Sequence, residues 1–179
     1  MRIISGQFKG RKFAPPSNKK YPTRPTTDFA KEALFNILQH QIDFESVTLL
    51  DLFGGFGGIS LEFISRGCTD VTFVDRSHDC CSFIKDVTSK LDIEEYIKIV
   101  KSDVKQFLKY NKTKFDIVLA DPPYELSGVA FLPEMILKND LLKDGGMFIF
   151  EHNSNHDFKK LPQYKETRSY GKSYFSFFE

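Results

Sequence analysis

The segment Asp121-Pro122-Pro123-Tyr124 carries the clearest chemical signal in this sequence. Its two prolines fix the backbone and remove two N–H donors, so the segment offers hydrogen-bond acceptors beside an aromatic ring. An exocyclic amine on a base fits such a loop, because Asp121 and the Pro122 carbonyl would accept its N–H groups. Tyr124 would stack on the base. We predict a loop that turns an amine into a nucleophile, with all four residues catalytic; the alternative is a rigid surface turn.

Four apolar runs in the sequence end in an acidic residue. The runs are residues 47–51, 71–75, 97–103 and 115–121, and the acids are Asp51, Asp75, Asp103 and Asp121. In an open α/β sheet, ligands bind at the carboxyl ends of the strands, where these four side chains would meet. Any one of them could instead cap a helix, since Asp is favoured at that position. Together they predict a ligand site along one rim of a sheet.

A glycine-rich turn follows the first of these acids. Four of its residues are glycines: Gly54, Gly55, Gly57 and Gly58. Backbone must approach a ligand there, because side chains would fill the space. Ser60 replaces the third glycine of the dinucleotide fingerprint, which argues against a nicotinamide or flavin cofactor. Asp75 ends the following strand, where a carboxylate can accept hydrogen bonds from both hydroxyls of a ribose.

The elements that must position these residues alternate along the chain. Apolar residues at helical spacing follow the four strands, over residues 59–65, 77–91, 104–110 and 129–142. A fifth strand is expected at 147–150, and an aromatic hairpin at 164–178 that turns at Gly171-Lys172 on one edge of the sheet. Within it, residues 174–178 favour an alternating edge strand over a base-stacking platform. The pattern predicts an α/β fold with a Rossmann-like, doubly wound, mostly parallel sheet and a C-terminal antiparallel hairpin.

The N-terminal part is strongly basic. Residues 1–31 hold eight basic side chains and one acidic one, a charge of +7, whereas the other 148 residues hold 17 basic and 23 acidic ones, a charge of −6. A phosphate backbone attracts such a segment, although a solvated tail would have the same composition. We expect a small basic arm or hairpin over residues 1–25, a helix capped by Thr26 or Thr27, and one compact domain over 26–179. The candidate contacts to such a backbone are Lys9, Arg11, Lys12 and Arg24, which the family resemblance given below would make contacts to RNA.

Composition excludes several classes of protein. The chain has 179 residues, 41% of them apolar, which is enough for one domain with its own core. It contains no apolar run of the roughly 20 residues that cross a bilayer and no apolar signal block, so we expect a cytoplasmic protein. Its three cysteines fit neither a disulfide framework nor a zinc site, and its four histidines are scattered. We expect both to be structural, the protein to be a monomer, and the chemistry to need no metal.

From about residue 47 onward the sequence resembles the class I S-adenosylmethionine-dependent methyltransferases. The resemblance implies that Gly55 and Gly57 make room for the methionine part of S-adenosyl-L-methionine and that Asp75 holds the ribose. Asp103 would bond the adenine amino group, and Asp51 would orient the glycine turn. The full set of implied cofactor contacts is Asp51, Phe53, Gly54, Gly55, Gly57, Asp75, Arg76, Asp103, Val104, Arg24 and Thr26. The segment at Asp121 is similar to the Asp/Asn-Pro-Pro-Tyr/Phe signature of amino methyltransferases.

Segments along nearly the whole chain resemble the RsmD family, the 16S ribosomal RNA guanine-N2 methyltransferases. They begin with Arg2-Ile3-Ile4-Ser5-Gly6 and Arg24-Pro25-Thr26-Thr27-Asp28 and continue through Glu151-His152 and Tyr170-Gly171. The resemblance implies methylation of one guanine of 16S ribosomal RNA in an assembled or nearly assembled small ribosomal subunit. Phe29 and Phe56 depart from the usual pattern of the family.

Three other functions remain open from the sequence. Adenine-N6 methylation of DNA or RNA would use the same loop as guanine-N2 methylation. A protein glutamine methyltransferase usually carries Asn at position 121 and would gain little from a basic arm. A nucleic-acid-binding protein without activity would not need the acids and the loop that this chain retains.

Overall fold

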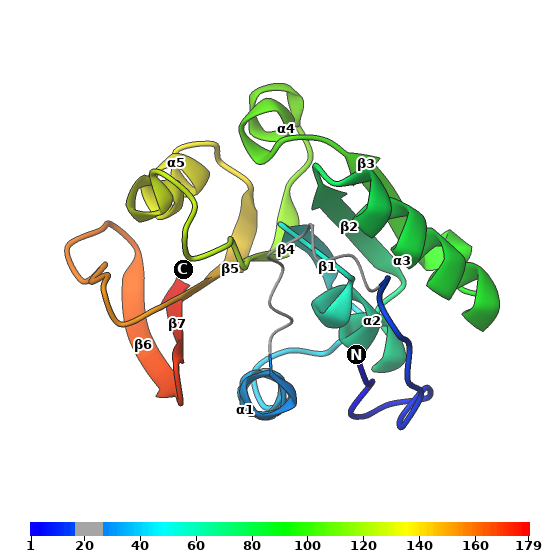
Figure 1. Ribbon diagram of the computed structural model, residues 1–179. Coiled ribbons are helices and arrows are strands. Elements are labelled where there is room, and N and C mark those ends of the chain that lie inside the picture. The colour runs from blue at the N-terminus through cyan, green and yellow to red at the C-terminus, as the bar shows by residue number, and fades with distance from the viewer. Residues whose placement is uncertain (17–26) are drawn as a thin grey trace.

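In the described part of the chain, seven strands form one sheet in the order β3-β2-β1-β4-β5-β7-β6 (Figure 1). The computed structural model describes residues 1–16 and 27–179. Strands β1 to β5 are parallel, and β7 pairs antiparallel with both β5 and β6. This is the predicted doubly wound sheet with its C-terminal hairpin. In chain order the elements are α1 (Asp28–Leu38), β1 (Thr48–Leu52), α2 (Gly58–Ser65), β2 (Asp70–Asp75), α3 (His78–Leu91), η1 (Glu94–Tyr96), β3 (Ile97–Lys101), α4 (Val104–Tyr110), β4 (Phe115–Ala120), η2 (Val129–Phe131), α5 (Leu132–Leu137), β5 (Leu142–His152), β6 (Tyr164–Tyr170) and β7 (Ser173–Phe178).

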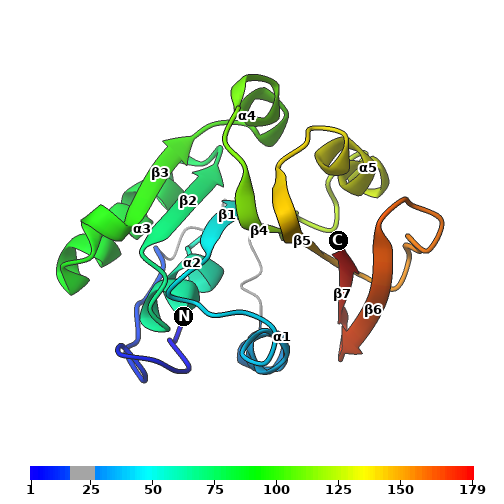
Figure 2. The same ribbon diagram turned by 180° about the vertical axis from the view of Figure 1, so that it is seen from behind.

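Helices cover both faces of the sheet and divide the hydrophobic core in two. On one face α1, α2 and α3 contribute residues such as Leu34, Phe63 and Ile84. On the other face α4 and α5 contribute Leu108 and Ile136. Figures 1 and 2 show these two layers from opposite sides, with α4 and α5 above the sheet and α1 and α2 below it. The sheet therefore lies between two layers of helices.

Strand β1 shows why the central strands of the sheet are largely apolar. Leu49 packs into the core under α1 to α3, and its neighbour Leu50 packs into the core under α4 and α5. Successive side chains of a strand point to opposite faces, so a strand covered on both faces has no solvent-facing positions. The strands predicted at 47–51, 71–75 and 115–121 are confirmed by β1, β2 and β4, with ends that differ by one residue.

Polar side chains fix where three helices begin. The Thr27 hydroxyl accepts a hydrogen bond from Ala30 N at 3.2 Å at the start of α1, as expected for one of the two threonines. Ser77 caps α3 in the same way through Cys80 N. At the start of α4 the carboxylate of Asp103 accepts from Lys105 N at 2.9 Å. Asp103 is thus a helix cap.

Four predicted elements differ from the structure. The fifth strand, expected at 147–150, is longer and spans Leu142–His152 as β5. The strand over 97–103 ends at Lys101, because Asp103 caps the next helix. The prediction of a helix over 129–142 is wrong beyond Leu137, where α5 ends. There the side-chain amide of Asn139 donates to Met135 O, and Asp140 takes a left-handed φ of 49°. The expectation of an alternating edge strand at 174–178 is also wrong. Strand β7 lies between β5 and β6 and is buried on both faces, so its phenylalanines face both cores.

Residues 1–13 fold back on themselves and pack against α2. Arg2 and Lys12 form an antiparallel bridge, and Ile3 is buried in the core. The loop is held on α2 by backbone groups of residues 4 to 8, including Gln7 N, which donates to Ser65 O at 2.7 Å. The predicted hairpin is therefore attached to the sheet domain along one helix.

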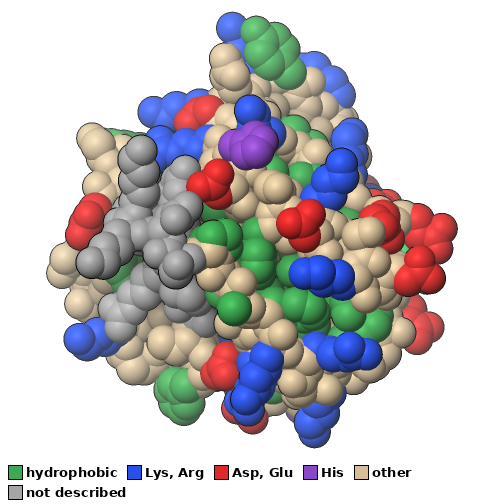
Figure 3. Space-filling view, turned by 45° about the vertical axis from the view of Figure 1, so that its right-hand side comes forward, with side chains coloured by type: hydrophobic (Ala, Val, Ile, Leu, Met, Phe, Trp, Pro, Cys, Tyr) green, Lys and Arg blue, Asp and Glu red, His purple; other side chains and the backbone are tan. Residues whose placement is uncertain are grey.

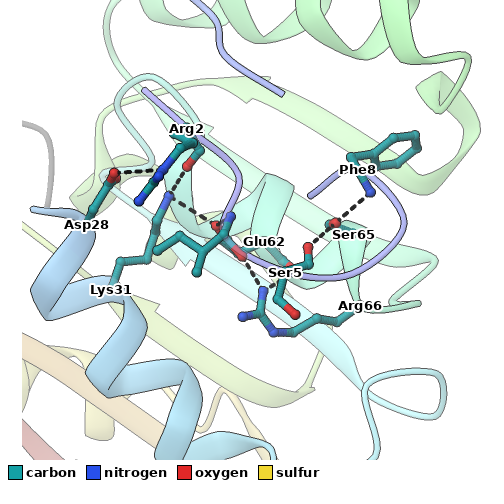
Figure 4. Close-up of polar contacts among 9 residues, drawn as sticks. Arg2, Ser5, Phe8, Asp28, Lys31, Glu62, Ser65 and Arg66 are labelled. Carbon is teal, nitrogen blue, oxygen red and sulfur yellow. Dashed lines mark hydrogen bonds and ion pairs between the residues drawn. The ribbon is translucent and has the colours of Figure 1, made fainter. Parts of the chain in front are cut away.

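A buried ionic network joins this N-terminal loop, α1 and α2 (Figure 4). The carboxylate of Glu62 is fully buried and receives Lys31 Nζ at 3.1 Å, while Arg66 pairs with its other oxygen. Ile4 N donates to Glu62 at 2.6 Å, and Lys31 Nζ also donates to Arg2 O at 2.5 Å. The guanidinium of Arg66 lies 4.2 Å from the centre of the Phe35 ring. One carboxylate thus connects three segments that are far apart in the sequence.

Within the described residues, no helix is long and apolar enough to cross a bilayer. The three cysteines are buried free thiols, as expected for structural residues.

Candidate active site

A cleft of about 1420 Å³ opens at the carboxyl ends of the parallel strands. Its volume exceeds the roughly 300–1,000 Å³ of a pocket for one small ligand, so it has room for two. Figure 3 shows one face of the molecule, where hydrophobic side chains near the centre are surrounded by charged ones. Most of the predicted site residues line this cleft: Asp51, Phe53, Gly54, Gly55, Asp75, Arg76, Asp103, Val104, Asp121, Pro122, Pro123 and Tyr124.

Asp75 is held in place by backbone donors. Gly55 N donates to one carboxylate oxygen at 2.9 Å, and Ser77 N donates to the other at 2.7 Å. The side chain is 9% exposed and lies at the last position of β2. Each carboxylate oxygen keeps a further lone pair, so the group can accept additional hydrogen bonds from a ligand.

Gly55 and Gly57, on either side of Phe56 in the glycine-rich turn, differ in the space around their Cα atoms. Gly55 has a φ of 54° and lines the cleft, and a Cβ there would meet only Phe53 O at 3.8 Å. Gly57 has a φ of 76° and does not line the cleft; a Cβ there would lie 2.2 Å from Ile84. The backbone is therefore open to a ligand at Gly55, whereas Gly57 allows α2 and α3 to pack closely.

Asp51 is a buried acid behind the glycine turn. It is 2% exposed and accepts a hydrogen bond from the Ser60 hydroxyl at 2.6 Å. Burial raises the pKa of Asp51 to about 7, against an opposing effect of the Ser60 hydrogen bonds. The negative charge of Asp75 nearby raises it further. Asp51 thus carries a proton in the folded protein at pH values where the unfolded chain has lost it.

Replacing Asp51 by Asn is expected to change the pH dependence of stability. Because the folded-state pKa of Asp51 lies above the unfolded value, its contribution to stability is present at low pH and is lost as the pH rises through about 7. Between pH 5 and pH 8 the wild type should lose about 2–3 kcal/mol of unfolding free energy relative to Asp51→Asn. Urea unfolding at both pH values measures this. Asp86→Asn, at an exposed position, is the control and should differ from the wild type by the same amount at both pH values. The prediction would be contradicted if the unfolding free energies of the wild type and Asp51→Asn differed by the same amount at pH 5 and pH 8.

The catalytic-loop candidate begins directly after β4. Asp121 N donates to Leu52 O at 3.3 Å, which holds the start of the loop against β1. The Tyr124 hydroxyl donates to the Glu151 carboxylate at 3.1 Å and lies 3.5 Å from Ser173 Oγ. Burial, with the charges of Glu151 and Asp121, raises the pKa of Tyr124 to about 12. The Tyr124 hydroxyl therefore stays protonated at physiological pH, and its hydrogen bond to Glu151 fixes the position of the ring.

Several residues at the cleft had no assigned role in the sequence interpretation. Glu151 and Ser173 hold Tyr124, from the end of β5 and the start of β7. Phe29 and Tyr170 line the same cleft, and their rings meet edge to face. Glu151 and Tyr170 lie in segments that carried the family resemblance, which was the only signal in the sequence that could have found them.

The N-terminal basic residues have different surroundings. Lys9, Arg11 and Lys12 are exposed on the loop over α2 and do not line the cleft. Lys31, counted among the basic residues of the N-terminal part, is buried against Glu62, and Arg2 pairs with Asp28 at 3.1 Å. Two further candidates, Arg24 and Thr26, lie outside the described residues.

Comparisons with known proteins identify a family and a fold for this chain. A family model described as "Conserved hypothetical protein 95" matches residues 1–179. Ribosomal RNA small subunit methyltransferase D of Haemophilus influenzae is 30% identical over 154 residues, which are 84% of this chain and 78% of that protein. The same protein of Escherichia coli is 28% identical over 162 residues, 90% of this chain and 79% of that protein. Among solved structures, a hypothetical protein of Thermus thermophilus has the same fold, with a TM-score of 0.86 at 24% identity over 100% of this chain and 99% of that one.

Proposed function

The chain belongs to the RsmD family, whose model is described as Conserved hypothetical protein 95, and from that premise we propose that it methylates the N2 amine of a guanine in 16S ribosomal RNA. The methyl donor in this proposal is S-adenosyl-L-methionine. The observation that carries the proposal is that Asp121 and Tyr124 share one cleft with Asp75, Asp103 and the glycine turn. The site thus combines a place for the donor with a loop for an amine.

The residues present fit a nucleoside cofactor with a methionine tail. The open backbone at Gly55 leaves space for the tail, and Asp75 has lone pairs for ribose hydroxyls. Asp103 and Val104 would hold the adenine at the start of α4, and Arg76 and Phe53 complete the wall. When bound, this cofactor supplies a methyl group activated by a sulfonium. The protein then needs no metal ion or covalent nucleophile to activate that methyl group.

The loop would position and activate the amine. Asp121 and the Pro122 carbonyl would accept its two N–H groups and turn its lone pair away from conjugation with the ring. Tyr124 would stack on the base, with its ring orientation set by the hydrogen bond to Glu151. Alignment of the attacking nitrogen with the methyl group supplies much of the rate enhancement in such reactions.

The product of the reaction tests the proposal. The protein is incubated with isotopically labelled S-adenosyl-L-methionine and, in parallel, small ribosomal subunits, protein-free 16S RNA or DNA. Nucleoside analysis should then find the label in N2-methylguanosine. If the label appeared only in N6-methyladenosine, the methylated base would be adenine and the proposal of guanine would be wrong. Comparing subunits with free RNA shows which form is the substrate.

Replacing Lys9, Arg11 and Lys12 together by Gln is expected to weaken RNA binding. All three are exposed on one loop outside the cleft, where they would contact phosphates. The KM for RNA should rise, and the slope of its logarithm against log salt should fall by about 2, since each lost phosphate contact removes about 0.7–0.9. Cofactor affinity, measured by calorimetry, should not change. If cofactor affinity fell in step with RNA affinity, the loop would belong to the cofactor pocket instead.

A further inference from the structure

Phe29, in the first turn of α1, is a large apolar side chain that is exposed at the cleft. It is 64% exposed, although burying a phenylalanine side chain contributes about 1.5–3 kcal/mol to stability. Within the described part of the chain, Tyr110 and Phe131 are the other strongly exposed large hydrophobic residues. Of these three, Phe29 alone lines the cleft. Its apolar ring can therefore contact a ligand bound in the cleft.

A second ring extends this apolar surface. Tyr170, the last residue of β6, meets Phe29 edge to face, with 6.5 Å between ring centroids and 74° between ring planes. It also lies against Phe175 in β7, which ties it to the sheet. The two rings come from opposite ends of the sequence and both line the cleft that contains Tyr124. We define Phe29 and Tyr170 as the aromatic pair.

The chemistry around the aromatic pair suits a nucleotide. Lys172 follows Tyr170 by two residues, is exposed on the hairpin turn, and lines the same cleft. It forms no ion pair with any described residue. An aromatic surface beside a cation is how proteins bind unpaired nucleotides, with the base stacked on a ring and the phosphate near the charge.

We propose that the aromatic pair is a second base-binding site. An unpaired RNA base adjacent to the methylated one stacks there, and Lys172 contacts its phosphate. The inference rests on the proposed function, because Tyr124 is reserved for the target base. Stacking tolerates any base, since every base has a flat aromatic face, so this site fixes the path of the RNA strand and leaves its sequence free.

Phe29→Ala tests the proposal against a matched control. It should raise the KM for 16S RNA or small subunits about tenfold and leave kcat unchanged, because a flanking contact binds substrate and transition state alike. Phe29→Trp keeps an aromatic face at this position and should therefore have the wild-type KM. Phe131→Ala removes a similarly exposed phenylalanine outside the cleft and should behave as the wild type. Unfolding free energy and cofactor affinity should stay constant in all three variants.

Three results would overturn the proposal. Phe29→Ala and Phe131→Ala could have the same KM, Phe29→Trp could be as impaired as Phe29→Ala, or cofactor affinity could fall together with RNA affinity. Filter binding of 16S RNA, which needs no turnover, separates this failure from failure of the proposed function. An enzyme that methylates no RNA contradicts the proposed function, whereas equal RNA affinity of the two alanine variants contradicts the aromatic pair.

Discussion

Asp121→Ala is expected to reduce kcat for methyl transfer by at least about 10³-fold while the dissociation constant of S-adenosyl-L-methionine changes little. Asp121 lies in the cleft at the start of the loop that follows β4, and its carboxylate is the proposed acceptor for the N–H groups of the amine. Without that acceptor, the nitrogen lone pair stays conjugated with the base. Single-turnover methylation with labelled cofactor measures the rate, and calorimetry measures cofactor affinity.

Two further variants separate the role of the Asp121 carboxylate from general damage to the loop. Asp121→Asn keeps one oxygen that can accept a hydrogen bond, so its rate should fall between those of the wild type and Asp121→Ala. Glu125→Ala removes an exposed carboxylate from the same cleft wall and should leave the rate near that of the wild type. Unchanged turnover of Asp121→Ala would exclude the proposed role.

Glu62→Ala is expected to lower the free energy of unfolding by about 3–5 kcal/mol. The substitution leaves the ammonium of Lys31 buried without its carboxylate, and Ile4 N loses its acceptor. Removing one partner of a buried ion pair costs much more than an exposed pair contributes, because the remaining charge cannot reach water. Urea denaturation followed by circular dichroism measures the loss.

The exposed pair of Glu134 and Lys138 provides the control for this prediction. These two residues are four positions apart, as Glu62 and Arg66 are, but both of their side chains are open to solvent. Glu134→Ala should therefore change the unfolding free energy by less than about 1 kcal/mol. Equal effects of Glu62→Ala and Glu134→Ala would show that burial of the network contributes nothing.

Much of the fold could be predicted because its signals are local. A strand covered on both faces leaves a continuous apolar run, as at Leu49 and Leu50, and a helix start leaves a capping side chain such as Thr27. The end of α5 was missed because an apolar period can continue into a turn, and the turn at Asp140 depends on backbone angles that composition does not specify. Strand β7 was placed in the right hairpin, but its neighbours in the sheet could not be read from its sequence.

The predicted site residues that line the cleft were found because each lies at the end of a strand or shortly after it, and parallel strands bring their ends together. Contacts from other parts of the chain could not be found in this way. A charge count treats Lys31 as part of a basic surface, although the structure buries it against Glu62. Likewise, nothing local to Tyr124 indicates that Glu151 and Ser173 hold its hydroxyl. Such contacts depend on how distant segments pack.

The position of β7 inside the sheet has a consequence for biosynthesis of the protein. The catalytic-loop candidate, residues 121–124, is synthesised before Ser173, which lies beside Tyr124 in the folded protein and begins β7. Between β5 and the outer strand β6 the sheet stays open until residues 173–178 have left the translating ribosome. A nascent chain without β7 therefore exposes both unpaired edges and an incomplete site, so the activity of this protein should begin only after β7 has been synthesised and has paired with β5 and β6.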